Sequence, residues 1–322
     1  MTDLVLTGMD AQNPLAFFAA LGLLRVLDDA VACTKGPRPR LGFHDQGSLT
    51  PYVVTSLSMD DVIRIVLEDA AVQADNPVLK IAYDKEGAER PPNHPDASHD
   101  LKPPPALART VLERLASAPP RASRLGAAFF AEFAVDNNGN TKPTSFHFTA
   151  GQQAFLAMVE ELRAHVSADD VREALVGPWV GSSKLPSLSW DSSVTRLYAL
   201  RAGNPAKEKR GSVPAANWLA VIGLEFFPVN VVKHRLVTTG VEGGWKNSTF
   251  TWPVWSPAAN AATIAGLLRS EVQRLSSSER EALGVVAVLR SSIMRSDQGG
   301  YGTFSPAAVV IPRAARVGKR SV

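Results

Sequence analysis

The segment LAFFAALGLLRVLDD, residues 15–29, limits what this chain can fold into more than any other stretch of the sequence. Asn13 and Pro14 precede it and are typical of a helix N-cap followed by a first helical turn. Apart from Arg25 and the two closing aspartates, the segment is apolar around the whole circumference of the predicted helix. Such a helix is stable in water only when other elements cover it on several sides. We therefore expect one buried N-terminal helix at the centre of the fold.

The remaining segments favour an α+β fold with mixed or antiparallel sheets and packed helices. Alternating or β-branched stretches predict strands at residues 40–46, 77–84 and 145–149, and apolar spacing predicts a helix over residues 124–136. These elements follow one another without the regular strand–helix–strand rhythm of a parallel sheet.

The chain divides, on this pattern, into two lobes. Residues 1–150 form an N-terminal α/β lobe, and residues 151–322 form a basic C-terminal α+β lobe. Residues 86–105 are rich in proline and polar groups, which disfavour regular structure. We interpret this segment as an exposed excursion from the first lobe.

The composition is typical of an intracellular globular protein. Of the 322 residues, 45% are hydrophobic and 20% are charged, which is enough to bury a sizeable core. A single cysteine, Cys33, excludes an internal disulfide framework. The start of the sequence does not resemble a signal peptide, and the longest apolar run, residues 15–27, is too short to span a bilayer. We expect a cytoplasmic protein without membrane contact.

The charge is distributed unevenly along the chain. The net charge is +3, but residues 1–160 hold 14 Lys and Arg against 19 Asp and Glu, whereas residues 161–322 hold 20 against 12. A basic half beside an acidic half favours a polyanionic partner on one side, with protein neighbours on the other.

Motifs for catalysis are largely missing from the sequence. It contains no glycine-rich dinucleotide fingerprint, no Walker loop and no G-x-S-x-G. The best metal-binding candidate is the segment NHPDASHD, with His94, Asp96, His99 and Asp100. It falls in the proline-rich excursion, where a site would be loosely held. We therefore expect no catalytic residue, no bound metal and no cofactor.

Cations and aromatic residues give the strongest remaining signal, because cations neutralise phosphates and aromatic rings stack on unpaired bases. Arg290, Arg295 and several tryptophans share the same half of the chain, and Trp190 and Trp218 are expected to anchor the core. The loop GVEGGWKNST, residues 240–249, resembles a finger with an aromatic and a cation at its tip. The predicted nucleic-acid-binding residues are Lys184, Arg196, Arg201, Lys207, Lys209, Arg210, Lys233, Arg235, Trp245 and Lys246.

Four blocks in a fixed order carry a family resemblance: NPLAFFAALGLLRVL, DSSVTRLYALRAGNP, PAANWLAVIGLEFFPV and FTWPVWSP. Together they resemble small CRISPR-associated proteins of type I loci, in particular the type I-G group once called I-U. Such proteins are taken to be diverged or shortened forms of the large subunit of the crRNA-guided surveillance complex. None of the four blocks is a catalytic signature.

The resemblance implies a non-enzymatic role in antiviral defence, inside a ribonucleoprotein. It implies contacts with crRNA and target DNA, with the other Cas subunits, and with a helicase–nuclease that the complex recruits. A subunit of that kind needs a basic surface for phosphates and a few side chains that reach bases.

Two alternatives stay open at this point. One is a metal-dependent nuclease that uses His94, Asp96, His99 and Asp100. The other is a protein-only adaptor whose basic half meets an acidic partner.

Overall fold

The structure is a computed structural model that describes residues 2–32, 36–45, 47–150, 153–193, 211–296 and 301–311. Helices and sheets alternate within these residues, and each strand pairing among them is antiparallel. The predicted α+β class is therefore confirmed.

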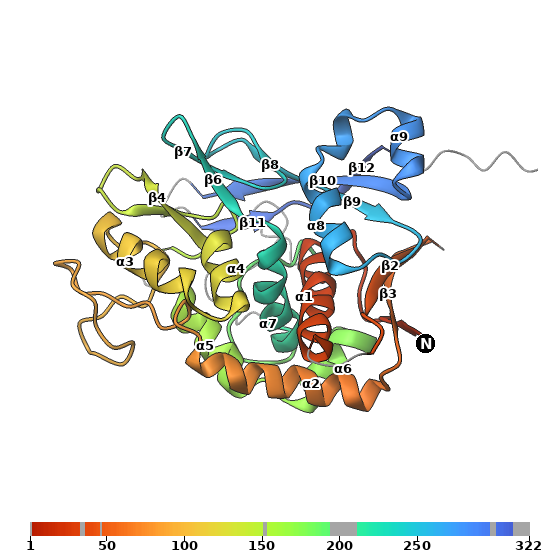
Figure 1. The fold of residues 1–322 in the computed structure, drawn as a ribbon, viewed down its shortest axis with the longest axis horizontal. Coiled ribbons are helices and arrows are strands. Elements are labelled where there is room, and N and C mark those ends of the chain that lie inside the picture. Colours follow the sequence, from red (N-terminus) through yellow and green to blue (C-terminus); the bar gives the residue numbers. More distant parts are fainter. Residues whose placement is uncertain are drawn as a thin grey trace, which may run out of the picture.

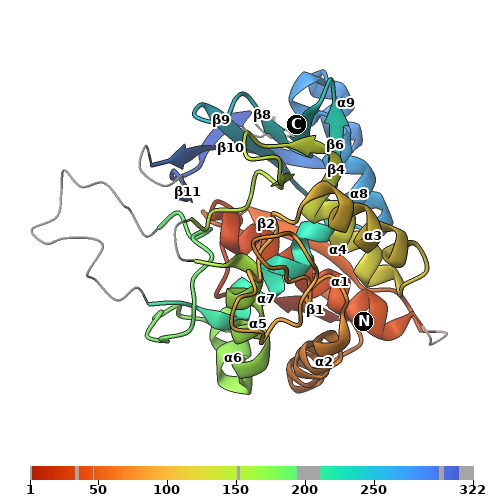
Figure 2. The same cartoon turned by 90° about the vertical axis from the view of Figure 1, so that its left-hand side faces the viewer.

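The centre of the molecule is a pair of closely packed helices, α1 (Pro14–Val31) and α7 (Pro214–Gly223). Almost every residue of α1 is buried, which confirms the predicted central helix. A Cβ on Gly22 would lie 1.8 Å from a carbonyl oxygen of α7, and one on Gly223 would lie 2.1 Å from a carbonyl oxygen of α1. Only glycine permits this approach of the two backbones. Figures 1 and 2 show the two helices side by side.

Two sheets and two separate hairpins surround this pair. One sheet has the order β1-β3-β2, and the other has the order β11-β10-β9-β8 with β12 also paired to β10. Hairpins β4–β5 and β6–β7 stand apart from both sheets. The strands are β1 (Thr2–Val5), β2 (Arg40–Asp45), β3 (Leu49–Thr55), β4 (Phe130–Val135), β5 (Thr141–Pro143), β6 (Val229–Val232), β7 (Arg235–Thr238), β8 (Val241–Glu242), β9 (Ser248–Trp255), β10 (Val285–Arg295), β11 (Gly302–Phe304) and β12 (Ala308–Ile311).

The other helices cover the outside of the central pair. Ser58 and Ser167 form capping boxes at the starts of α2 and α6. Figure 1 shows α2 and α6 below the central pair and the larger sheet above it. The helices are α2 (Met59–Val72), α3 (Pro105–Ala116), α4 (Pro120–Phe129), α5 (Phe155–His165), α6 (Ala168–Val176), α8 (Ala261–Arg269) and α9 (Ser277–Ala282), with 3-10 turns η1 (Gln73–Asp75), η3 (Leu224–Phe226) and η4 (Val272–Arg274).

Aromatic side chains join α1 to the larger sheet. The ring centroids of Phe18 and Phe250 lie 5.2 Å apart, and those of Phe17 and Trp252 lie 5.8 Å apart. The buried indole of Trp252 donates a hydrogen bond to the carbonyl oxygen of Ala11 at 3.0 Å. The aromatic content of the C-terminal half therefore serves the core in large part, because a buried indole needs both apolar contacts and one acceptor.

Three predicted elements are wrong. Residues 77–84 form turns with isolated bridges from Tyr83 to Glu89 and to Ser98, because their apolar side chains pack on the core without pairing to a neighbouring strand. Residues 145–149 are a loop that buries two phenylalanines. The helix predicted over residues 124–136 ends at Phe129 and continues as strand β4, which leaves Phe133 68% exposed.

The predicted lobe boundary at residue 150 falls inside a shared core. Helix α1 comes from the first predicted lobe and α7 from the second, yet each covers the other. Residues 88–93 of the proline-rich excursion are exposed, and the excursion is tied back by hydrogen bonds between Tyr83 and Ser98. No helix in the described part of the chain is both long and apolar enough to cross a membrane.

Candidate nucleic-acid interface

The predicted binding residues fall into two groups. Arg196, Arg201, Lys207, Lys209 and Arg210 belong to residues 194–210, which lie outside the described residues, as does Cys33. The structure places the other five, which are Lys184, Lys233, Arg235, Trp245 and Lys246. All five are exposed.

Two of the predicted cations lie at the tip of the β6–β7 hairpin. Lys233 and His234 have positive φ angles of 49° and 60°, as in the tight two-residue turns that match the twist of a hairpin. Val232 and Arg235 form the closing pair of the hairpin. Lys233 and Arg235 are exposed, and no carboxylate of a described residue forms an ion pair with either. The turn therefore presents two cations directly to solvent.

Lys184 lies on a different segment of the chain from the other described candidates. It follows Ser183, whose backbone bridges to Ser212 in the connection between α6 and α7. The hairpin cations and Trp245 instead lie on the β region that follows α7. The structure thus does not join Lys184 to the other predicted residues.

Trp245 differs from the other tryptophans of the chain. Trp190, Trp218, Trp252 and Trp255 are at most 1% exposed, which confirms the anchoring role predicted for Trp190 and Trp218. Trp245 is 62% exposed, on the loop between β8 and β9. Trp252 and Trp255 belong to the core, so they contribute nothing to a binding surface.

The loop that carries Trp245 has a defined shape. Gly243 has a φ of 95°, and a Cβ at this position would lie 2.3 Å from the carbonyl oxygen of Asn247. The backbone N–H of Asn247 donates to the carbonyl oxygen of Gly244 at 3.1 Å. The turn therefore requires glycine at position 243 and holds Trp245 and Lys246 at its tip.

A guanidinium group lies against the face of this indole. The Cζ of Arg295 is 3.8 Å from the centroid of the Trp245 ring and 5.4 Å from that of Phe148. Strand pairing explains the meeting: Ile293 of β10 is opposite Ser248 of β9, so Arg295 continues past the start of β9 toward the preceding loop. We call Trp245 and Arg295 together the indole platform.

Backbone carbonyl groups hold the guanidinium of Arg295 in place. It donates to the oxygen of Ser145 at 2.8 Å and to the oxygen of His147 at 3.2 Å, while its Nε is buried without a hydrogen-bond partner in the described structure. No carboxylate of a described residue pairs with it. Burial lowers the pKa of Arg295 to about 10, which leaves it charged at neutral pH. The platform therefore contains a desolvated cation without a described counter-ion.

A buried pair, Asp100 and His147, lies beside the carbonyl group that accepts from Arg295. Asp100 Oδ1 lies 3.0 Å from Nε2 of His147 and accepts the backbone N–H of Phe155 at 3.0 Å. Burial disfavours the charged form of Asp100, but these hydrogen bonds outweigh it and lower its pKa to about 2. Burial lowers the pKa of His147, and the positive charges of Lys102 and Arg295 add to that effect. His147 thus lies near two positive charges, Lys102 and Arg295, and one carboxylate, Asp100, whose hydrogen bond and charge act in the opposite direction.

The four metal-binding candidates do not converge. His94 Nδ1 accepts the backbone N–H of Asp96 at 3.2 Å, and His99 Nε2 lies 2.6 Å from the carbonyl oxygen of Leu79. Asp100 is held by His147, as above. In the ranges that the structure covers, no three His, Cys, Asp or Glu side chains are grouped as metal ligands. The segment anchors the excursion to the core instead.

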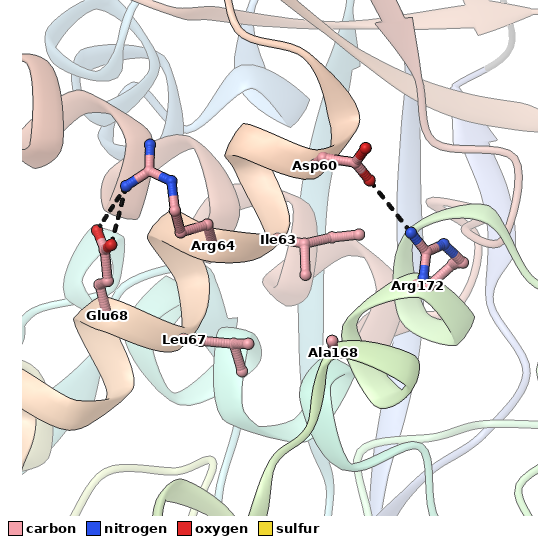
Figure 3. A pocket seen from close by; sticks show the side chains of 7 residues that line it. All are labelled: Asp60, Ile63, Arg64, Leu67, Glu68, Ala168 and Arg172. Carbon is pink, nitrogen blue, oxygen red and sulfur yellow. Dashed lines mark hydrogen bonds and ion pairs between the residues drawn. The ribbon is translucent and has the colours of Figure 1, made fainter.

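A shallow, open groove of about 400 Å³ lies between α2 and α6, on the side of the molecule away from β7 and β8 (Figures 1 and 3). Its charged side chains neutralise one another. Arg64 Nη1 lies 2.9 Å from both carboxylate oxygens of Glu68, and Arg172 Nη2 lies 3.2 Å from Asp60 Oδ1. This groove offers a ligand no uncompensated charge, in contrast to the indole platform.

Comparisons with known proteins add no relative: no model of a known family matches the chain, and no curated protein matches it either.

Proposed function

We propose that this chain is a non-catalytic, nucleic-acid-binding subunit of a type I CRISPR effector complex, contacting crRNA, target DNA or both. The observation that carries the proposal is the guanidinium of Arg295, which is largely buried under an exposed indole and faces no described carboxylate. A phosphate chain supplies the negative charge that such a site lacks. The family resemblance of the four sequence blocks supports the same conclusion.

Exposed cations on the β6–β7 hairpin also support phosphate binding. Lys233 and Arg235 on the β6–β7 hairpin have no described ion-pair partner. Figures 1 and 2 show the ends of β6, β8 and β9 along one side of the molecule, above the central helices. Unpaired cations contribute to nucleic-acid affinity because each phosphate contact releases condensed counterions.

Exposed apolar side chains support contacts with neighbouring subunits. Phe133 is 68% exposed on β4, and Val232 and Val237 are 53% and 41% exposed on the β6–β7 hairpin. Strands β4 and β6 contact each other, so these side chains belong to neighbouring elements. Large exposed apolar groups are typical of surfaces that bind other proteins.

The test is the salt dependence of binding to crRNA and to duplex DNA, measured by fluorescence anisotropy from about 50 to 200 mM salt. We expect the double variant Lys233→Ala/Arg235→Ala to bind more weakly and to reduce the slope of log affinity against log salt by about 2. The matched control is Arg64→Ala/Arg172→Ala, which removes two cations from the groove on the far side and leaves the slope unchanged.

Two outcomes contradict the proposal in different ways. Equal slopes for wild type and the hairpin variant remove the β6–β7 turn from the interface. A wild-type protein that binds neither crRNA nor DNA at the lowest salt refutes nucleic-acid binding altogether, and leaves the protein-only adaptor as the function to pursue.

A further inference from the structure

Trp245 presents an exposed aromatic face on the loop between β8 and β9. One face of the indole lies against the Arg295 guanidinium at 3.8 Å, yet the side chain as a whole remains 62% exposed. The loop glycine at position 243 holds the ring there, and the core gains nothing from it. An exposed indole that is fixed from beneath presents a flat π face to a ligand.

We propose that Trp245 stacks on one unpaired base, so that the indole platform selects single-stranded over double-stranded nucleic acid. This inference rests on the proposed function and names its substrate class. Bases of a duplex already stack on one another and offer no free face, whereas an unpaired base can leave its neighbours and cover an aromatic ring.

Preorganisation of the platform favours this ligand. The carbonyl oxygens of Ser145 and His147 fix the guanidinium, and the guanidinium fixes one face of the ring. Binding a base therefore costs little ordering of protein side chains. Lys246, next along the loop, is exposed and places a positive charge beside the stacked nucleotide.

The charge around the platform favours a nucleotide over an apolar protein pocket as the ligand. Arg295 has no described carboxylate partner, and both Arg295 and Lys102 act on His147 as positive charges. A protein pocket that closed over the indole would remove still more water from a cation that has no carboxylate partner among the described residues, which is costly. A nucleotide covers the ring with its base and brings its own negative charge within the screening distance.

The experiment compares two probes of equal length, a single strand of about 12 nucleotides and the matching duplex, both labelled with fluorescein. We expect Trp245→Ala to weaken single-strand binding by about 10-fold, which is the usual contribution of one base–aromatic stack. Duplex binding changes by less than about 2-fold, because no base stacks in that complex. Trp245→Phe restores most of the single-strand affinity, since its ring still offers a π face.

Two controls separate stacking from charge and from folding. Val72→Ala removes an exposed apolar side chain at the end of helix α2, outside the proposed interface, and leaves both affinities unchanged. A single strand of the same length without bases keeps every phosphate; it binds wild type and Trp245→Ala equally well. The slope of log affinity against log salt is the same for the two proteins, because the substitution removes no cation.

The outcomes distinguish the two proposals. If the wild-type protein binds neither probe, nucleic-acid binding and base stacking both fail. If it binds but Trp245→Ala weakens single strand and duplex equally, or weakens neither, base stacking alone is refuted and the nucleic-acid-binding function stands.

Discussion

Two sites in this molecule contain buried arginine, and they differ in what neutralises the positive charge. Between α1, α2, α4 and η3 lies a group that we call the helix ion cluster. Its members are Arg25, Asp29, Asp69, Arg121, Arg124 and Glu225. The indole platform has one arginine, Arg295, and no described carboxylate.

Each arginine of the helix ion cluster faces at least one carboxylate. Arg121 lies 2.8 Å from Asp29 and 2.5 Å from Asp69. Arg124 hydrogen-bonds to Glu225, and Nε of Arg25 is 3.3 Å from the same carboxylate. Each positive charge of the cluster therefore has a carboxylate beside it inside the protein, although Arg25 Nε, Asp69 Oδ2 and Glu225 Oε1 make no hydrogen bond in the described structure.

The comparison shows that burial of an arginine does not by itself indicate a binding site. The helix ion cluster connects the helices that cover α1, and its removal should affect folding. In the platform, the Arg295 cation lies beside an exposed ring and has no described counter-charge. Substitutions in the platform should therefore affect binding. Stability measurements on single variants can test this distinction.

The largest expected effect is that of Arg121→Met in the helix ion cluster. The substitution leaves Asp69 and Glu225 buried with fewer partners, and we expect the free energy of unfolding to fall by about 3–5 kcal/mol. Denaturant titration measures this loss. Arg64→Met is the matched control, because Arg64 forms an exposed pair with Glu68 and its removal should have little effect on stability. A loss for Arg121→Met no larger than that of the control would contradict the assigned role of the cluster.

A smaller effect is expected for Asp100→Asn, which tests whether Asp100 stabilises the fold through its hydrogen bond to His147. The pKa of Asp100 is lowered from 3.8 to about 2, so its charged form stabilises the fold at any pH above about 4 and loses this effect as the pH falls toward 2. The variant should be less stable than wild type by about 2 kcal/mol at pH 7 and nearly equal to it at pH 2.

Denaturant titration at pH 7 and at pH 2 measures the effect of Asp100→Asn on stability. The substitution is conservative in shape, because the asparagine oxygen can still accept the backbone N–H of Phe155. A difference that persists unchanged at low pH would show that geometry rather than charge is responsible. Asp100→Asn should neither strengthen nor weaken single-strand binding, because Asp100 does not touch the indole platform.

Local sequence predicts the elements whose cause is local. Residues 15–29 are apolar on all sides, and that fact alone requires a central helix. Ser58 and Ser167 are each followed three residues later by an aspartate, and both form capping boxes. Residues 77–84 mislead for the opposite reason, because apolar side chains indicate burial but do not indicate whether a neighbouring strand is available for pairing.

The indole platform could be predicted only in part. Glycines around Trp245 identify an exposed loop tip, and that prediction of exposure is confirmed. Arg295 appears in the sequence as one of many scattered cations, and only the register of β10 against β9 brings it to Trp245. Register depends on the whole sheet, so no nearby residue signals it.

The smallest expected effect on stability is that of Arg295→Met. It is the most direct test of whether Arg295 differs from the arginines of the helix ion cluster. Met removes the hydrogen bonds to Ser145 and His147, which destabilises the fold, but it also removes a desolvated charge that no described carboxylate compensates. These effects oppose each other, so we expect the free energy of unfolding to change by less than about 1 kcal/mol. Denaturant titration under the conditions used for Arg121→Met gives the comparison. A loss as large as that of Arg121→Met would mean that Arg295 is a structural ion like those of the helix ion cluster, because only a compensated charge costs that much to remove.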